Sequence, residues 1–252
     1  MSGNGLFNGG QRRIYHEGEK PPVFERLPYD ICEVVTDVEP LVFHPAFAGS
    51  GLVTTVDITE KICGITADMI DWWWGNLEKG YHIWAPGEHY GFEWIVPPCD
   101  VGYEGSVEAA YEFDPAHPVV ITRVSMEKYP YTECFAHCWI AQGHLGPAKT
   151  TLIHMYEDTE GGILWRTTQV MEEKDLVCLK ENRIEMPDTT SHLQYESGRL
   201  RYFLPQLYAL WKDHPDPWQN IRFDLRVAKQ EDGTWRHTST NDNWVLKKQR
   251  IH

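Results

Sequence analysis

His192 and Glu196 lie four residues apart in the run TTSHLQYESGRLRYFLPQLYALW, and both side chains carry atoms that bind metal ions. In a helix, residues at this spacing share one face, one turn apart, so an imidazole nitrogen and a carboxylate oxygen can converge on one point. Zinc takes three or four such ligands at about 2.0–2.2 Å. The pair therefore supplies half of a metal site, and another part of the chain must supply the rest.

A second group of candidate ligands lies upstream, behind an aromatic block. The segment ITADMIDWWWGNLEKGYHIWAPGEHYGFEW contains Tyr81, His82, Glu88 and His89. Two carboxylates, Glu108 and Glu112, follow in GSVEAAYEFD. Imidazole nitrogens and carboxylate oxygens together are a typical ligand set for zinc.

This combination resembles the zinc-dependent hydrolases that cleave carbon-carbon bonds in phloroglucinol ketones, the family of diacetylphloroglucinol hydrolase and phloretin hydrolase. The shared features are the Ile-Thr-Ala-x-Met-x-Asp-Trp-Trp pattern at residues 65–73, then Tyr81, and then Trp84, Pro86 and His89 as Trp-x-Pro-x-x-His. The likeness extends over about residues 55–212. It implies a zinc-dependent hydrolase that removes an acyl group from a phenolic or polyketide ring.

The resemblance also implies a set of metal ligands. Carried over residue by residue, the zinc ion would be held by His89, Glu112, His192 and Glu196. Glu108 lies on the same face of the same predicted strand as Glu112, so the two carboxylates compete for one ligand position. The sequence favours Glu112 and leaves Glu108 as the alternative.

Further residues acquire roles from the same resemblance. The segment TLIHMYEDTEGGILWR places His154 as a pocket histidine, with Tyr81 as its catalytic partner in holding oxygens of an aromatic ketone substrate and moving protons. Phe92 stands where a polar substrate contact is expected, and Trp73 and Trp84 are expected to border the pocket. These apolar side chains predict a larger and less polar aromatic ketone than diacetylphloroglucinol.

Composition excludes several classes of partner. The chain has 252 residues and a net charge of −14, which argues against binding to nucleic acid or to an anionic membrane. No stretch approaches the 18 or more apolar residues of a membrane span, and the N-terminus has no apolar signal core, so a cytoplasmic protein is expected. The six cysteines are too sparse for a disulfide framework and are expected to be free thiols.

The pattern of elements predicts one domain with a leader. Residues 1–50 read as an irregular segment, used in the resembling family for dimerisation, so a homodimer is expected. A helix capped by Thr66 precedes strands at 105–113, 118–127, 134–141, 149–157 and 162–171. A long helix opens at Asp188 to Ser191 and runs to about Lys212, with a kink expected at Pro205, and a strand is expected at 221–229.

A curved antiparallel sheet around one long C-terminal helix is the α+β helix-grip fold, which we expect for residues 51–252 as the catalytic domain. Its pocket lies between sheet and helix. The alternative to a hydrolase is a polyketide cyclase or lyase, or a small-molecule binder, on the same scaffold. No internal repeat or low-complexity segment competes with this interpretation.

Overall fold

The computed structural model describes residues 25–35, 51–112, 114–128, 134–145, 147–184 and 189–240. The strands are β1 (Glu33–Val34), β2 (Leu52–Cys63), β3 (His89–Val96), β4 (Val107–Glu112), β5 (Val119–Arg123), β6 (His137–Leu145), β7 (Ala148–Thr159), β8 (Gly162–Glu172), β9 (Asp224–Lys229) and β10 (Trp235–Ser239). The helices are α1 (Ala67–Trp74), α2 (Tyr81–Trp84), α3 (Pro98–Val101), α4 (Glu173–Glu181) and α5 (Thr189–Trp211), with short 3₁₀ turns at Leu77–Lys79 and Met126–Lys128.

The strands form one antiparallel sheet in the order β1-β2-β8-β7-β6-β5-β4-β3, and the β9–β10 hairpin attaches to β6. Five of these strands, β4 to β8, coincide with the predicted ones to within a few residues. The sequence did not predict β2, although it is one of the two longest strands. Polar and apolar residues mix along β2, which lies between β1 and β8 and contacts α5.

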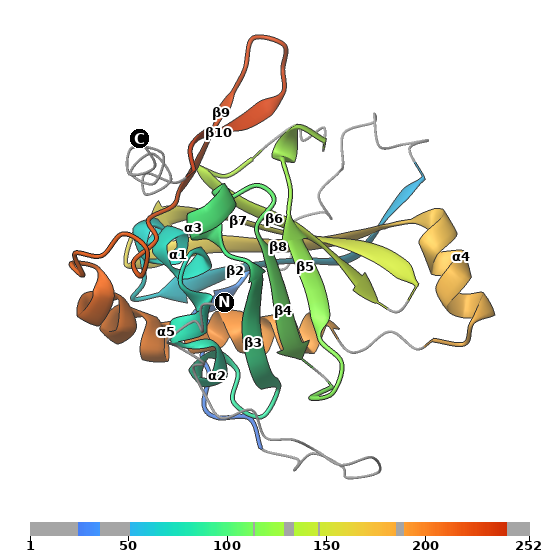
Figure 1. Cartoon of the computed structure of the whole chain (residues 1–252), viewed down its shortest axis with the longest axis horizontal. Coiled ribbons are helices and arrows are strands. Elements are labelled where there is room, and N and C mark those ends of the chain that lie inside the picture. Colours follow the sequence, from blue (N-terminus) through green and yellow to red (C-terminus); the bar gives the residue numbers. More distant parts are fainter. Residues whose placement is uncertain are drawn as a thin grey trace, which may run out of the picture.

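Helix α5 is the element that the sheet wraps around, as Figure 1 shows. It spans Thr189–Trp211, close to the predicted range, and contains Pro205; Asp188 lies outside the described residues. A large antiparallel sheet closed on a long C-terminal helix is the helix-grip fold, so this prediction is confirmed. No helix in the described part of the chain is long and apolar enough to cross a membrane.

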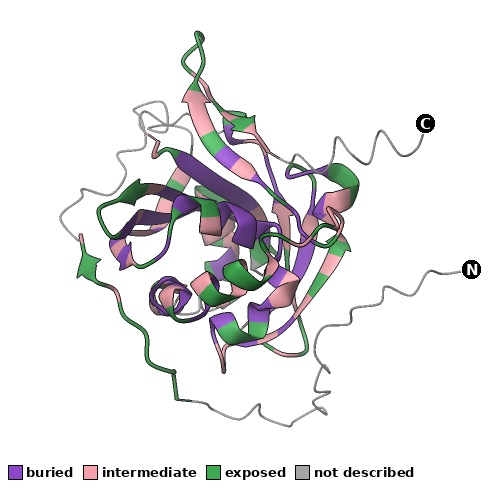
Figure 2. Cartoon of the chain, turned by 90° about the vertical axis from the view of Figure 1, so that its left-hand side faces the viewer, coloured by how far each residue is buried: buried purple, intermediate pink, exposed green. Residues whose placement is uncertain are grey.

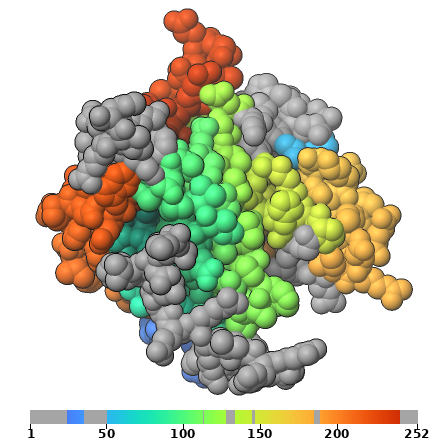
Figure 3. All heavy atoms as spheres, viewed as in Figure 1, coloured from blue at the N-terminus to red at the C-terminus, as the bar shows by residue number. Residues whose placement is uncertain are grey.

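Helix α1 covers one end of the sheet and fixes the aromatic residues there. Thr66 caps it, since the Thr66 side chain accepts a hydrogen bond from the Met69 amide, as predicted. Trp73 and Trp74 are almost completely buried in the main apolar cluster, which joins α1, α5 and the inner face of the sheet. Figure 2 shows this buried zone between the sheet and the helices, and in Figure 3 the β9–β10 hairpin and α4 project from the body.

Residues 25–35 form a strap that lies along α5 and pairs with β2. The Asp30 amide donates to the Gly198 carbonyl (3.1 Å), and β1 pairs with β2 at Glu33 and Lys61. A disulfide joins Cys32 to Cys63, which corrects the prediction that all cysteines are free thiols. Most of the predicted leader 1–50 lies outside the described residues, so its role in dimerisation stays a prediction.

Candidate functional site

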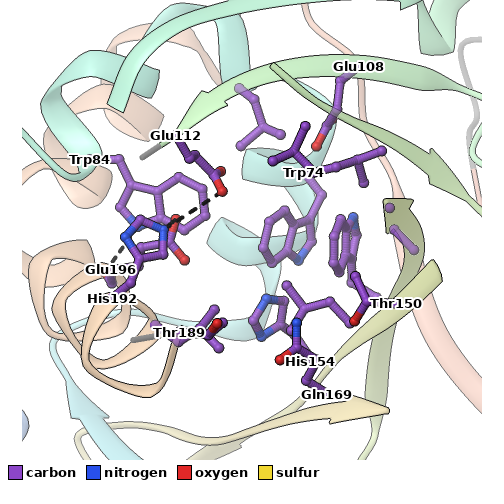
Figure 4. Close-up of a pocket in the computed structure, with 18 of the residues that line it drawn as sticks. Trp74, Trp84, Glu108, Glu112, Thr150, His154, Gln169, Thr189, His192 and Glu196 are labelled. Atoms are coloured by element: carbon purple, nitrogen blue, oxygen red, sulfur yellow. Dashed lines mark hydrogen bonds and ion pairs between the residues drawn. The ribbon is translucent and has the colours of Figure 1, made fainter. Parts of the chain in front are cut away.

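A pocket of about 110 Å³ lies between the inner face of the sheet and α5. Figure 4 shows Glu112, His192 and Glu196 on one side of it and Trp74, His154 and Thr150 on the other. Its wall is largely apolar, with Leu77, Val119, Ile121, Trp139, Ala141, Leu152 and Leu193 among the lining residues. A largely apolar wall with a few converging polar groups is typical of a small-molecule site.

The polar side of the pocket brings together the four residues that the sequence singled out as metal ligands. His89 opens β3 and is the cross-strand partner of Glu112, which closes β4, while His192 and Glu196 come from α5. One ligand atom from each of the four lies within 4.8 Å of all the others. In the described part of the chain this is the one group of three or more potential ligands that meets this geometry.

The distances within this cluster suit one ion bound at its centre. His89 Nε2 lies 2.9 Å from Glu196 Oε1 and 3.9 Å from Glu112 Oε1. His192 Nε2 lies 3.6 Å from Glu196 Oε1 and 3.8 Å from Glu112 Oε2. Ligands placed tetrahedrally at about 2.1 Å from zinc are about 3.4 Å apart, so the spacing fits such an ion.

Hydrogen bonds at the outer nitrogens set the tautomer of both imidazoles. The Tyr81 carbonyl lies 3.0 Å from His89 Nδ1, and a Glu88 carboxylate oxygen lies 2.6 Å from His192 Nδ1. Because these oxygens only accept, each Nδ1 carries a proton and each Nε2 is directed to the centre. His89 Nε2 is buried and makes no hydrogen bond. The donor set therefore fits a divalent ion.

The cluster is electrostatically uneven. Burial lowers the pKa of His89 to about 3, so this imidazole is neutral. Burial also lowers the pKa of His192, but the neighbouring carboxylates of Glu196, Glu88 and Glu112 outweigh it and raise that pKa to about 9. Burial raises the pKa of Glu196 to about 7. Two carboxylates facing two imidazoles in a buried space form a site that a divalent cation would neutralise.

Tyr81 belongs to the wall of this cluster. Its hydroxyl donates a hydrogen bond to Glu112, and its ring stacks on His89 with the centroids 4.1 Å apart. Burial, followed by the charges of Glu112 and Glu196, raises the pKa of Tyr81 well above its usual value. Tyr81 is thus a neutral phenol that orients one carboxylate and still borders the pocket.

His154 lies on the opposite side, among tryptophan rings. It stacks on Trp74, with ring centroids 5.3 Å apart, and burial lowers its pKa to about 3. Thr167 Oγ1 accepts from the Trp165 indole (2.8 Å) and lies 2.9 Å from His154 Nδ1. The Thr167 hydroxyl can both donate and accept, and its contact with Nδ1 holds the imidazole ring of His154 in place. His154 therefore offers a neutral imidazole to the pocket.

Of the three residues predicted to contact a substrate, one lines the pocket and two do not. Trp84 lines the pocket, and its indole N–H donates to the Glu196 carbonyl (3.0 Å). Trp73 is buried in the core, and Phe92 packs on Tyr81 and Trp94, so neither is among the lining residues. Trp74 takes the place expected of Trp73. The run of three tryptophans in the sequence indicated an aromatic pocket wall, but it did not indicate which of the three rings faces the pocket.

Glu88 is one of the upstream candidates to which the sequence assigned no role, and it contacts the cluster from outside. One of its oxygens accepts from His192 and the other pairs with Arg26 Nε at 2.6 Å. These contacts, Arg26 included, lower the pKa of Glu88, although burial acts in the opposite direction. The strap is thereby tied to the cluster of His89, Glu112, His192 and Glu196 through one carboxylate. The adjacency of Glu88 and His89 in the sequence was the available signal.

Comparison with known proteins gives likenesses in fold. No family model matches the chain, and no curated protein matches it. Similar solved structures include Ara h 8.0201 (11% identity, TM-score 0.42, covering 62% of this chain and 99% of that chain). The di-domain ARO/CYC BexL from the BE-7585A biosynthetic pathway has 12% identity and a TM-score of 0.38, covering 64% and 52%. Norcoclaurine synthase from Thalictrum flavum has 16% identity and a TM-score of 0.39, covering 60% and 96%.

These likenesses correct one prediction. The similar structures are helix-grip proteins that include a cyclase and norcoclaurine synthase, whereas the sequence predicted a zinc-dependent hydrolase of carbon-carbon bonds. That assignment of the enzyme is therefore wrong in the light of the comparison, and no reaction is carried over from these distant structures. What holds is a helix-grip protein with a pocket between its sheet and its long helix.

Proposed function

We propose that this protein binds a planar, oxygenated small molecule of the aromatic-ketone or polyketide class, with one divalent metal ion, zinc by preference, at His89, Glu112, His192 and Glu196. The observation that carries the proposal is the convergence of these four ligand atoms at the edge of an apolar pocket. A bound ion would supply positive charge that holds and polarises a ligand oxygen.

The ligand class follows from the side chains that border the pocket. Trp74, Trp84 and Trp139 offer flat apolar surfaces to a ring. His154 supplies a neutral imidazole across the pocket from the metal cluster, which can hydrogen-bond to a carbonyl or a phenolic hydroxyl group. A cavity of about 110 Å³ is of the order of the cavities that hold a single benzene ring. A ring with oxygen substituents would contact the metal ion on one side of the pocket and His154 on the other.

A second candidate function is a cyclase or lyase step on such a molecule. Two groups in the pocket wall that can transfer protons support this candidate. The Tyr81 hydroxyl donates to Glu112, and burial raises the pKa of Glu108 to about 7. A group whose pKa lies near the working pH is suited to general acid-base chemistry. Turnover of a bound polyketide would separate this candidate from a binder.

The test of the proposed function has two measurements. Protein purified without chelator is expected to contain about one equivalent of metal by elemental analysis, and the His192→Ala variant far less. Metal-loaded protein is then titrated with ortho-hydroxyacetophenone, a planar ketone that can chelate through two oxygens, while tryptophan fluorescence is followed. Binding that disappears when the metal is removed supports the proposal. Metal content below about a tenth of an equivalent, or binding equal with and without metal, contradicts it.

A further inference from the structure

Glu108 is a buried carboxyl group in the pocket wall that takes no part in the metal cluster. It lies on β4, four residues before Glu112, so the two side chains share one face of the strand. Both line the pocket. Four residues of strand place their Cα atoms about 13 Å apart, so the two carboxylates mark separate positions along the cavity. In Figure 4 the Glu108 carboxylate points toward the space beside Trp74, away from His192.

Arg123 holds this carboxyl group from behind the wall. Arg123 Nη2 lies 2.8 Å from Glu108 Oε2 and donates to the Trp74 carbonyl at 2.9 Å. Its guanidinium also lies over the Trp94 ring, 4.8 Å from the centroid. The arginine is therefore fixed on several sides and does not line the cavity. The ion pair with Arg123 is the polar contact that the Glu108 carboxylate makes among the described residues, so its other oxygen is left to the pocket.

A carboxyl group in this position costs free energy, because the surrounding wall of the pocket is apolar. Val119, Ile121 and Trp139 line the same pocket. Burial raises the pKa of Glu108 to about 7, since Arg123 offsets only part of the cost and the charge of Glu112 adds to it. A carboxyl group poised near neutrality readily shares a proton with a hydroxyl group that comes within hydrogen-bonding distance.

We infer that Glu108 is a second polar anchor of the pocket, which takes a hydroxyl group on the side of the ligand ring remote from the metal-binding oxygens. This inference rests on the proposed function, because it assumes that the ligand sits with one side at His89, Glu112, His192 and Glu196. It narrows the ligand to rings with oxygen substituents on opposite sides. The carboxyl group selects a hydroxyl over a methoxy group, because only the hydroxyl can donate a hydrogen bond.

The experiment compares two ligands on matched proteins. The ligands are ortho-hydroxyacetophenones with either a hydroxyl or a methoxy group para to the ketone, and affinities are measured by calorimetry on metal-loaded protein. The wild-type protein is expected to prefer the hydroxyl compound by about 10- to 100-fold, the range of a hydrogen bond to a charged group. Glu108→Gln is expected to reduce this preference to about threefold or less, whereas Glu93→Gln on the exposed surface of β3 leaves it intact.

The ratio between the two ligands separates recognition from structure, because a merely structural role of the Glu108 and Arg123 pair would weaken both ligands alike. Metal content is expected to be unchanged in Glu108→Gln. If that variant does not fold, Glu108→Asp keeps the charge, draws the carboxylate back, and is expected to lower the preference. An unchanged preference in the folded variant overturns the inference alone. Failure of the wild-type protein to bind ortho-hydroxyacetophenone itself overturns the proposed function and this inference with it.

Discussion

At the scale of single residues, the two imidazoles of the cluster differ from ordinary buried histidines in what their outer nitrogens contact. A backbone carbonyl and a carboxylate fix Nδ1 of His89 and His192 as donors, which directs both Nε2 atoms at Glu112 and Glu196. The Tyr81 hydroxyl contacts the same cluster through Glu112, and the Tyr81 ring stacks on His89. A ligand and the partner of a ligand should therefore respond differently to mutation.

We expect His192→Ala to lose the metal, whereas Tyr81→Phe keeps it. The first change removes a ligand, and the second removes one hydrogen bond to the Glu112 carboxylate. Elemental analysis of both variants, each purified without chelator, measures the difference. Equal metal loss in the two variants would show that Tyr81 is itself part of the coordination sphere.

Glu88→Gln is expected to weaken metal affinity by about 10- to 100-fold, the usual effect of changing a partner of a metal-binding histidine. The neutral amide no longer supports the proton on His192 Nδ1 as the carboxylate does at 2.6 Å. Competition with a chromogenic chelator measures the affinity. Glu93→Gln, on the exposed side of β3, serves as the control. An affinity within twofold of the wild-type value would remove Glu88 from the site.

At the scale of elements, the site depends on how closely α5 is held. Trp84 donates to the Glu196 carbonyl, and Ser197 donates to Glu60 of β2 at 2.5 Å. On the other side of the helix the strap packs on Gly198, where a side chain would meet Tyr29 Cδ2 at 2.7 Å. The glycine lies in the middle of α5 for this close approach, although helix propensity alone disfavours it there.

Gly198→Ala is expected to destabilise the protein, by about 1 kcal/mol or more, although alanine favours a helix over glycine by about the same amount. The added methyl group displaces Tyr29 and the strap. Chemical denaturation measures the change in free energy of unfolding. In a Tyr29→Ala background the same substitution should be close to neutral or stabilising. If Gly198→Ala instead stabilises the protein in the wild-type background, the strap moves aside without a loss of stability.

At the scale of the whole molecule, burial of acidic groups makes stability depend on pH. Glu60 lies beneath α5 and is completely buried. Burial raises its pKa to about 7, although the Ser197 hydroxyl acts against this. A carboxyl group whose pKa is higher in the folded state contributes stability that is present below about pH 4.5 and is lost as the pH rises through about 7.

We therefore expect Glu60→Gln to raise the free energy of unfolding near pH 8, by up to about 3 kcal/mol, and to have little effect near pH 4.5. The amide keeps the shape of the side chain and carries no charge. Denaturation curves at several pH values measure the difference between variant and wild-type protein, with Glu93→Gln as an exposed control. A difference in free energy of unfolding that stays constant over the whole pH range would show that burial does not raise the pKa of Glu60.

The sequence by itself determined most of the elements and the candidate ligand residues. Strands β4 to β8 are rich in β-branched and aromatic residues and are separated by Gly, Pro or Asp, which local patterns reveal. Thr66 caps α1, and the four-residue spacing of His192 and Glu196 placed both on one face of a helix. The fold class followed from these elements. Strand β2 was not predicted. Its burial depends on β8 and α5, which come from later parts of the chain.

Only the tertiary structure decided which side chains meet. It placed Glu112 rather than Glu108 in the cluster, because the pairing of β3 with β4 sets Glu112 opposite His89. It turned Trp74 rather than Trp73 to the pocket, joined Cys32 to Cys63, and brought Arg26 to Glu88 and Glu88 to His192. These contacts join residues far apart in the chain, or choose between neighbours on one element. Local periodicity contains no information about either, since register and packing are fixed only when the whole sheet closes on α5.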